Sequence, residues 1–194
     1  MSMRVIAGSA RGHRLECPPG LDVRPAPEIA RAALFNILCQ EVVDAEVLDL
    51  FAGVGSVGIE ALSRGAVRAV FVEINGRHRA FLEKNLQHTR LADRAEVLGQ
   101  DAFRAPEWCA RTGRKFDIIY LGPPFPMYRI AADKTALVDL ADRLAEGGAL
   151  KPGGVLILQS DERESLPETT RALKQDDRRI YGRNAFAFYR RAGE

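Results

Sequence analysis

The sequence predicts an α/β fold with a seven-stranded, mainly parallel sheet that has an antiparallel end. Three observations support this prediction. Short apolar segments alternate with helical segments, one apolar segment leads directly into a glycine-rich turn, and the chain closes with two further strand-like segments. With 194 residues and a hydrophobic content of 46%, the chain has the size of one domain with a small extension and can bury a proper core.

The expected elements of the sheet follow one another in alternating order. Strand candidates are short apolar runs at 47–51, 68–73, 95–99, 116–121 and 154–159. Helical patterns lie between them, at about 56–64, 77–89, 104–112 and 131–146. The segment "RRIYGRNAFAFYRR" contains two more strands with turn residues between them, and these close the sheet.

The first part of the chain lies outside this alternation. The segment "RVIAGSARGHRLECP" is typical of two short strands about a glycine-containing turn, which predicts a hairpin. A helix entered through Pro27 follows, and its apolar face is expected to consist of Ile29, Ala33, Leu34, Ile37 and Leu38. We therefore expect residues 1–42 to form a hairpin and helix extension that packs on a main domain of residues 43–194.

Composition narrows the class of protein. Because the sequence has no run of about 18 apolar residues and its N-terminus lacks the apolar region of a signal peptide, we expect a cytoplasmic protein without contact to a membrane. Three widely spaced cysteines and three histidines indicate neither a disulfide framework nor a metal site. We expect a monomer.

The net charge of +2 is unevenly distributed. Residues 1–36 carry five arginines against three acidic residues, and residues 171–194 carry seven basic against three acidic residues. Arginine suits phosphate recognition, because the guanidinium group can bind a phosphate through two parallel hydrogen bonds. The basic ends therefore favour a nucleic-acid partner, and the alternative is a solvated arginine-rich surface.

The strongest local motif is "VLDLFAGVGSVGIEALSRGA", residues 47–66. A strand ends at Phe51, glycines at 53, 55 and 58 allow a tight turn beside a ligand, and a helix begins at once. Glu73 lies 20 residues after Gly53, at the end of the next strand, where a ribose diol is commonly held. These features predict a nucleotide-binding turn. The alternative is that the glycines only allow close packing of strand and helix.

Two acidic residues distinguish an adenosyl-methionine site from a nicotinamide site. Asp49 lies within the strand, four residues before the first glycine, where its carboxylate can hold a methionine ammonium group. Asp101 and the Ala102 amide follow the third strand, where they can hydrogen-bond an adenine edge. The alternatives are that Asp49 only orients the glycine loop and that Asp101 only caps the next helix.

These motifs, taken in order, resemble a known family. The segments "RVIAGSARGHRL", "DLFAGVGSVGIEALSRGA", "FVEIN", "QDAF" and "PPF" are similar to those of bacterial methyltransferases that modify the exocyclic N2 of a guanine in 16S rRNA. The resemblance implies a class I methyltransferase (Rossmann-like) fold and S-adenosyl-L-methionine as cofactor. It also implies a small-ribosomal-subunit substrate, held partly by the N-terminal hairpin with Arg11 and Arg14.

The resemblance further assigns cofactor contacts, residue by residue. It places the methionine and ribose of the cofactor against Asp49, Phe51, Gly53 and Gly55. It implies that Glu73 binds the ribose hydroxyls, and that Asp101 and Ala102 bind the adenine. Arg24 and Pro25 match a loop that covers the cofactor, although Ala26 stands where a threonine is usual.

The sequence departs from the family at "GPPF", residues 122–125. The family has Asp or Asn in place of Gly122, and its side chain and a proline carbonyl accept hydrogen bonds from the target amine while the aromatic residue stacks on the base. Here Pro123, Pro124 and Phe125 are present, and the side-chain acceptor is missing.

Three interpretations of Gly122 remain open. The enzyme is slow, because one preorganised partner is worth about 10²–10³ in rate. Alternatively another group substitutes, with Tyr128, Asp117 or a water on the Pro123 carbonyl as candidates, or Gly122 is not the natural residue. Tyr120 is expected to pack in the core, and Tyr128 either covers the base or is structural.

Four functions are compatible with these motifs to different degrees. An rRNA guanine-N2 methyltransferase is favoured. A catalytically impaired homologue that binds the cofactor and the ribosome is the alternative, and Gly122 specifically supports it. The arginine-rich ends disfavour a small-molecule methyltransferase. An NAD-dependent oxidoreductase leaves the "PPF" loop unexplained.

Overall fold

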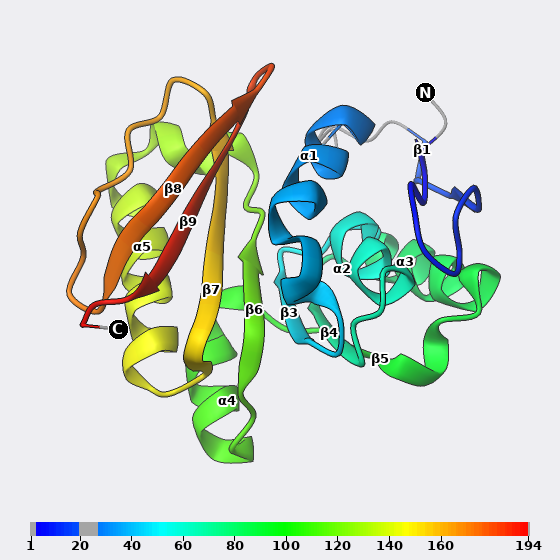
Figure 1. The fold of residues 1–194 in the computed structure, drawn as a ribbon, viewed down its shortest axis with the longest axis horizontal. Coiled ribbons are helices and arrows are strands. Elements are labelled where there is room, and N and C mark those ends of the chain that lie inside the picture. Colours follow the sequence, from blue (N-terminus) through cyan, green and yellow to red (C-terminus); the bar gives the residue numbers. More distant parts are fainter. Residues whose placement is uncertain (1–2, 20–26, 194) are drawn as a thin grey trace. The chain divides into compact units, whose positions relative to one another are not determined.

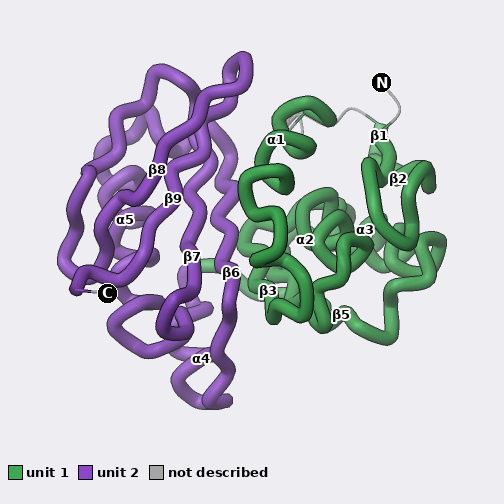
Figure 2. The backbone as a smooth tube through the Cα atoms, in the orientation of Figure 1, with its two compact units in different colours: residues 1–102 green, residues 103–194 purple. Residues whose placement is uncertain are grey.

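The structure, a computed structural model, describes residues 3–19 and 27–193 (Figure 1). The chain consists of two compact units, residues 1–102 and residues 103–194 (Figure 2). The division into an extension and a main domain at residue 42 stays a prediction. Among the helices in the described part of the chain, none has the length and apolar composition needed to span a membrane.

In its described residues, the first unit contains the hairpin, three α-helices, two short 3-10 helices and three parallel strands. Its elements are β1 (Met3–Arg4), β2 (Arg14–Leu15), α1 (Glu28–Leu38), η1 (Cys39–Val42), β3 (Glu46–Leu50), α2 (Ser56–Ser63), β4 (Arg68–Val72), α3 (Gly76–Thr89), η2 (Ala92–Arg94) and β5 (Ala95–Leu98). β1 and β2 pair antiparallel, and β4 pairs parallel with both β3 and β5. Helix α2 contacts β3 and β4, whose apolar runs are almost completely buried.

The second unit contains two helices and four strands. After η3 (Ala102–Arg104), its elements are α4 (Ala105–Thr112), β6 (Phe116–Leu121), η4 (Phe125–Arg129), α5 (Ala131–Glu146), β7 (Leu150–Asp161), β8 (Leu173–Tyr181) and β9 (Asn184–Arg191). β6 pairs parallel with β7, and β9 pairs antiparallel with both β7 and β8. Helix α5 contacts β7 and β8.

The strands of the main sheet have the order β5-β4-β3-β6-β7-β9-β8. This arrangement confirms the predicted α/β fold with seven strands, an antiparallel end and a separate N-terminal hairpin. β7 begins at Leu150, four residues before the predicted strand, because Leu150 pairs with Phe116 across a β-bulge.

The apolar face predicted for α1 is confirmed for Leu34 and Leu38 and wrong for Ile29. Ile29 is 80% exposed, and the buried residues are Ala30, Arg31, Leu34, Phe35 and Leu38. The buried face is therefore displaced to include a charged residue. Arg31 is accommodated there because its guanidinium group donates a hydrogen bond to the Arg4 carbonyl and lies 3.8 Å from the fully buried carboxylate of Glu60 in α2.

The N-terminal hairpin is attached to the end of α2. The Glu60 carboxylate accepts hydrogen bonds from the Ile6 amide at 2.8 Å and the Ala7 amide at 3.1 Å. The Ser9 amide donates to the Ser63 carbonyl at 2.8 Å. Gly8 adopts a φ of +84°, and a Cβ there would lie 1.8 Å from the Ser63 carbonyl oxygen. Only glycine allows this close approach, so the hairpin and α2 are fitted to each other.

Candidate active site

The glycine turn after β3 has the backbone conformation that its sequence predicts. Gly53 and Gly55 have φ values of +58° and +86°, and Gly55 caps α2. A Cβ on Gly55 would lie 2.2 Å from Cδ1 of Leu82, so a side chain is excluded by space as well as by conformation. Phe51 also has a positive φ, +60°, which is an uncommon conformation for a bulky residue and often marks a ligand site.

Glu73 holds the start of this turn. Its Oε2 accepts a hydrogen bond from the Gly53 amide at 2.7 Å, and its Oε1 accepts one from the Asn75 amide at 2.7 Å. A carboxylate has about four acceptor positions, so both oxygens can still accept from hydroxyl groups. The position of Glu73 beside the turn suits the ribose diol of a nucleotide.

Asp49 holds the end of the same turn. Its Oδ2 accepts a hydrogen bond from the Gly58 amide at 2.9 Å, and the residue is 1% exposed. Burial raises the pKa of Asp49 to about 7, the Gly58 amide opposes this shift, and the charge of Glu73 adds to it. The bond to Gly58 favours the interpretation that Asp49 orients the glycine loop. Its contact with a methionine ammonium group stays a prediction.

The raised pKa of Asp49 predicts a pH dependence of stability. The unfolded chain loses the Asp49 proton near pH 3.8, whereas the folded chain keeps it to about pH 7. The free energy of unfolding should therefore fall as the pH rises from 4 to 7, and Asp49→Asn should lack this fall. Between pH 5 and pH 8 the difference is on the order of 2 kcal/mol, measurable by urea unfolding.

Asp93→Asn is the matched control for this measurement, because Asp93 is exposed in η2 of the same unit. It should leave the pH dependence of the parent unchanged. Equal slopes for the parent and the Asp49→Asn variant would contradict the assignment.

The remaining predicted cofactor contacts lie after β5 and before α1. Asp101 is exposed and Ala102 is buried, where η3 begins. The N-cap residue of α4 is Arg104, so Asp101 is not the cap of that helix. Arg24 and Pro25 lie outside the described residues.

The proline loop follows β6 in the second unit. β6 ends at Leu121, Gly122 follows, and Pro123 and Pro124 lead into η4. Pro123 is buried, and Phe125 is half-buried. The Met127 amide donates to the Pro124 carbonyl at 3.0 Å, which closes the turn after the prolines.

The two side chains that were candidates to replace the missing acceptor have other partners. Tyr128 is 3% exposed, and its hydroxyl donates to the Gln159 carbonyl at 2.8 Å. Burial raises the pKa of Tyr128, so the phenol stays neutral. Asp117 forms an ion pair with Lys151 at 2.8 Å. Tyr128 and Asp117 are therefore engaged in contacts within the sheet and its adjoining turn.

A different tyrosine lies beside Gly122. A Cβ on Gly122 would be 2.8 Å from Cε1 of Tyr120 and 3.3 Å from its hydroxyl oxygen. Tyr120 is 3% exposed, as its expected core position requires, and its hydroxyl donates to Oε1 of Gln159. This polar contact was not predicted from the sequence. No local pattern could signal it, because the two residues lie 39 positions apart in the sequence.

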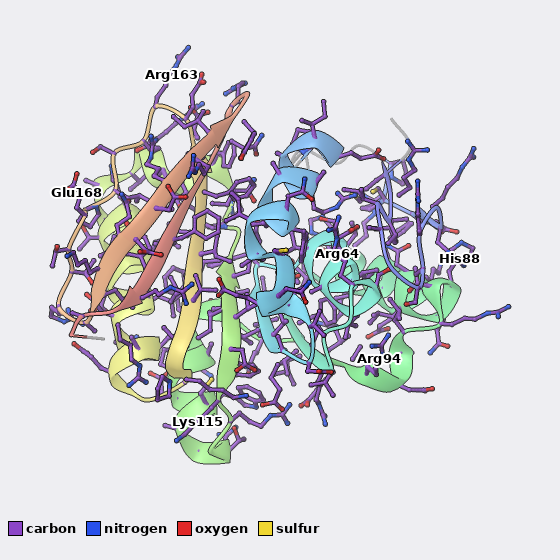
Figure 3. All side chains as sticks on the ribbon, in the orientation of Figure 1. Arg64, His88, Arg94, Lys115, Arg163 and Glu168 are labelled. Atoms are coloured by element: carbon purple, nitrogen blue, oxygen red, sulfur yellow. The ribbon has the colours of Figure 1, made fainter. Side chains whose placement is uncertain are left out.

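The predicted RNA contacts lie on the hairpin of the first unit. Arg11 and Arg14 are exposed, Arg11 in the turn and Arg14 on β2. Arg64 directly follows α2 (Figure 3), close to the hairpin's attachment. Its guanidinium group lies over the ring of Phe35 at 5.1 Å. The ring of His13 contacts that of His88 at 5.3 Å, with His88 at the end of α3 (Figure 3).

Two curated proteins are similar to the chain over most of its length. Ribosomal RNA small subunit methyltransferase D of Escherichia coli strain K12 is 30% identical over 192 residues, which cover 99% of the chain and 91% of that protein. The protein of the same name from Haemophilus influenzae is 33% identical over 179 residues, which cover 89% and 87%.

Solved structures agree with these sequence relatives. The Escherichia coli protein yhhF superposes with a TM-score of 0.80 at 30% identity and full coverage of both chains. A hypothetical protein from Thermus thermophilus, TTHA0928, gives a TM-score of 0.78 at 31% identity, covering 96% of the chain and 98% of that protein. The family model described as conserved hypothetical protein 95 matches residues 3–190. The chain therefore belongs to the conserved hypothetical protein 95 family, the family of the small-subunit rRNA methyltransferases D.

Proposed function

We propose that the chain is an rRNA methyltransferase that transfers a methyl group to the exocyclic N2 of a guanine in 16S rRNA of the small ribosomal subunit. The observation that carries this proposal is the glycine turn held at both ends by buried acids, Glu73 on Gly53 and Asp49 on Gly58. This turn occurs in a chain whose relatives are named small-subunit rRNA methyltransferases.

S-adenosyl-L-methionine is the cofactor, and the residues of the turn fit it. Glu73 would accept hydrogen bonds from the ribose hydroxyls with oxygens that already hold two backbone amides. Asp49, Phe51, Gly53 and Gly55 would contact the methionine and ribose of the cofactor. Asp101 and Ala102 would contact its adenine. When bound, the cofactor would supply an activated sulfonium methyl group for transfer to the N2 nitrogen, with S-adenosyl-L-homocysteine as the by-product.

The protein's own contribution to this transfer is positioning, because the methyl group is already activated. Phe125 would stack on the guanine, and the Pro123 carbonyl would accept a hydrogen bond from the N2 amine. Pro123 and Pro124 fix the direction of both groups, since each proline ring locks its φ. The amine nitrogen gives up one proton to water after it has gained the methyl carbon.

The hairpin would hold the RNA through its phosphates. Arg11 and Arg14 are exposed on a hairpin that Glu60 and Ser63 fix to α2. A fixed basic hairpin loses little conformational freedom on binding, which favours affinity for a phosphate backbone.

Gly122 supports a second candidate, a catalytically impaired homologue that binds the cofactor and the ribosomal subunit without turnover. The residue offers no side-chain acceptor to the amine. Losing one such acceptor costs about 10²–10³ in rate.

A transfer assay separates the two candidates. Purified protein is incubated with methyl-labelled S-adenosyl-L-methionine and 30S subunits that lack the modification, and the product nucleoside is identified by mass spectrometry. We expect N2-methylguanine. The Arg11→Gln/Arg14→Gln variant should raise KM for the subunit, with unchanged cofactor affinity by calorimetry, since the arginines contact only RNA.

Each result bears on one part of the proposal. A methyl group on a ring nitrogen or a ribose would contradict the N2 assignment. Binding of cofactor and subunit without product would favour the impaired homologue. Tight binding of NAD with no heat from S-adenosyl-L-methionine would overturn both.

A further inference from the structure

Tyr120 occupies the space in which a side chain at position 122 would begin. Gly122 directly follows β6, which ends at Leu121, and the Cβ direction of Gly122 runs towards Tyr120, two positions earlier. The ideal Cβ of residue 122 would lie 2.8 Å from Cε1 of Tyr120, closer than real Cβ contacts, and 3.3 Å from its hydroxyl oxygen. With Tyr120 in this position, a side chain at position 122 would require the tyrosine ring to shift. The absence of a side chain at position 122 and the position of the Tyr120 ring are therefore linked sterically.

Three strands hold the Tyr120 hydroxyl in place. It donates its hydrogen to Oε1 of Gln159 on β7, and Nε2 of Gln159 donates to Oδ1 of Asn184 on β9 at 2.7 Å. Gln159 and Asn184 are 7% and 6% exposed. The contact with Asn184 fixes which way the Gln159 amide faces, so its carbonyl oxygen is directed to Tyr120. A buried polar network of this kind is rigid when its members are satisfied.

The register of the sheet explains why Gln159 lies at this point. Tyr120 is paired with Ile157 and Leu121 with Leu158 at the end of β6, and Gln159 is the next residue along β7. The amide side chain is thus contributed by the neighbouring strand, one residue beyond the last paired position.

We propose that the hydroxyl oxygen of Tyr120 replaces the side chain of residue 122 as hydrogen-bond acceptor for the target amine. This inference rests on the proposed function. A phenolic oxygen carries one hydrogen and two lone pairs, and the hydrogen is donated to Gln159. The oxygen therefore acts towards the amine as an acceptor. Tyr120 is a neutral acceptor and not a base, and the proton of the methylated nitrogen still goes to water.

Gln159 and Asn184 are positioning residues in this arrangement. They hold the hydroxyl in one orientation and do not contact the substrate. The acceptor is preorganised before the amine arrives, and this property gives hydrogen-bonding groups their effect on a transition state.

The test compares two buried tyrosines of the same unit. Tyr120→Phe removes the proposed acceptor, and Tyr128→Phe removes a hydroxyl that is equally buried and also bonded to Gln159, through its carbonyl. In the 30S transfer assay, Tyr120→Phe should lower kcat by about 10²–10³ with KM almost unchanged. Tyr128→Phe should change kcat by less than about tenfold. Cofactor affinity and Tm, measured on the same preparations, report whether each variant is folded.

The outcomes separate this inference from the proposed function. An active parent whose kcat is unchanged by Tyr120→Phe would contradict the inference alone. An equal loss in both variants, with an equal fall in Tm, would assign Tyr120 a structural role and also contradict it. A parent that binds cofactor and subunit without transferring methyl groups would contradict the inference together with the proposed activity.

Discussion

Introducing Gly122→Asp into the Tyr120→Phe variant is expected to raise kcat by about 10²–10³, back towards the rate of the parent. Phenylalanine lacks the hydroxyl that binds Gln159, so its ring is released to move away from position 122. The new carboxylate then supplies the acceptor. Because it stabilises the amine as its nitrogen becomes positively charged, the gain should appear in kcat rather than in KM. Single-turnover transfer to 30S subunits measures it.

Two controls test whether the gain in kcat comes from the new carboxylate and whether it depends on the residue at position 120. Gly122→Ala in the same background adds bulk without an acceptor and should not restore the rate. Gly122→Asp in the parent should gain little, since its Cβ would lie 2.8 Å from a ring that Gln159 still holds. The two substitutions are thus expected to be strongly non-additive. Additive effects on the rate would mean that positions 120 and 122 act independently.

Glu60→Ala is expected to lower the free energy of unfolding of the protein by about 3–5 kcal/mol, the usual cost of leaving one member of a buried ion pair behind. The side chains of Glu60 and Arg31 are both 0% exposed. The substitution also removes the acceptor for the Ile6 and Ala7 amides, so the hairpin loses its attachment to α2. Urea unfolding measures the loss, and hydrogen exchange should show reduced protection at residues 3–15.

Glu96→Ala is the matched control for this experiment. Glu96 belongs to the same unit and pairs with Arg68 at 2.9 Å, but the two side chains are 30% and 48% exposed. Removing such a pair should change stability by at most about 1 kcal/mol. A loss at Glu60 no larger than that at Glu96 would show that the buried pair and the hairpin contacts contribute little.

Local sequence patterns were sufficient to predict most elements of the fold. β6 ends where predicted, at Leu121, because the prolines that follow have no amide hydrogen for a ladder. The start of β7 was missed. "KPGG" at 151–154 has the composition of a turn, and only its pairing with β6 makes it part of a strand. Pairing of this kind depends on residues distant in the sequence.

The prediction of which residues of α1 are buried was partly wrong for a similar reason. Periodicity treats Arg31 as a residue of the exposed face, and its partner Glu60 lies in a different helix. A charged residue can enter a core when its counter-charge is already there, and the spacing of apolar residues carries no information about this.

In the candidate site, too, some contacts could be predicted from local sequence spacing and others could not. The glycine turn and Glu73 follow one another closely in the sequence, and their spacing predicted that they meet. The contact between Tyr120 and Gln159 joins residues 39 positions apart, and that between Gln159 and Asn184 joins residues 25 apart. Tyr120 and Gly122 are only two residues apart, so their proximity needs no long-range pairing. The polar partners of Tyr120 required the strand register.

Helix α2 has only eight residues, and hydrogen bonds connect it both to Asp49 beside the glycine turn and to the hairpin. Asp49 holds the amide of Gly58, and two residues later Glu60 holds the hairpin. One residue of an α-helix corresponds to a rotation of about 100°. An insertion or deletion between these two points would turn Glu60 away from Ile6 and Ala7 while leaving the glycine turn in place. Length changes in evolving members of this family should therefore be excluded from α2 and tolerated in the exposed connections, such as the segment between β7 and β8.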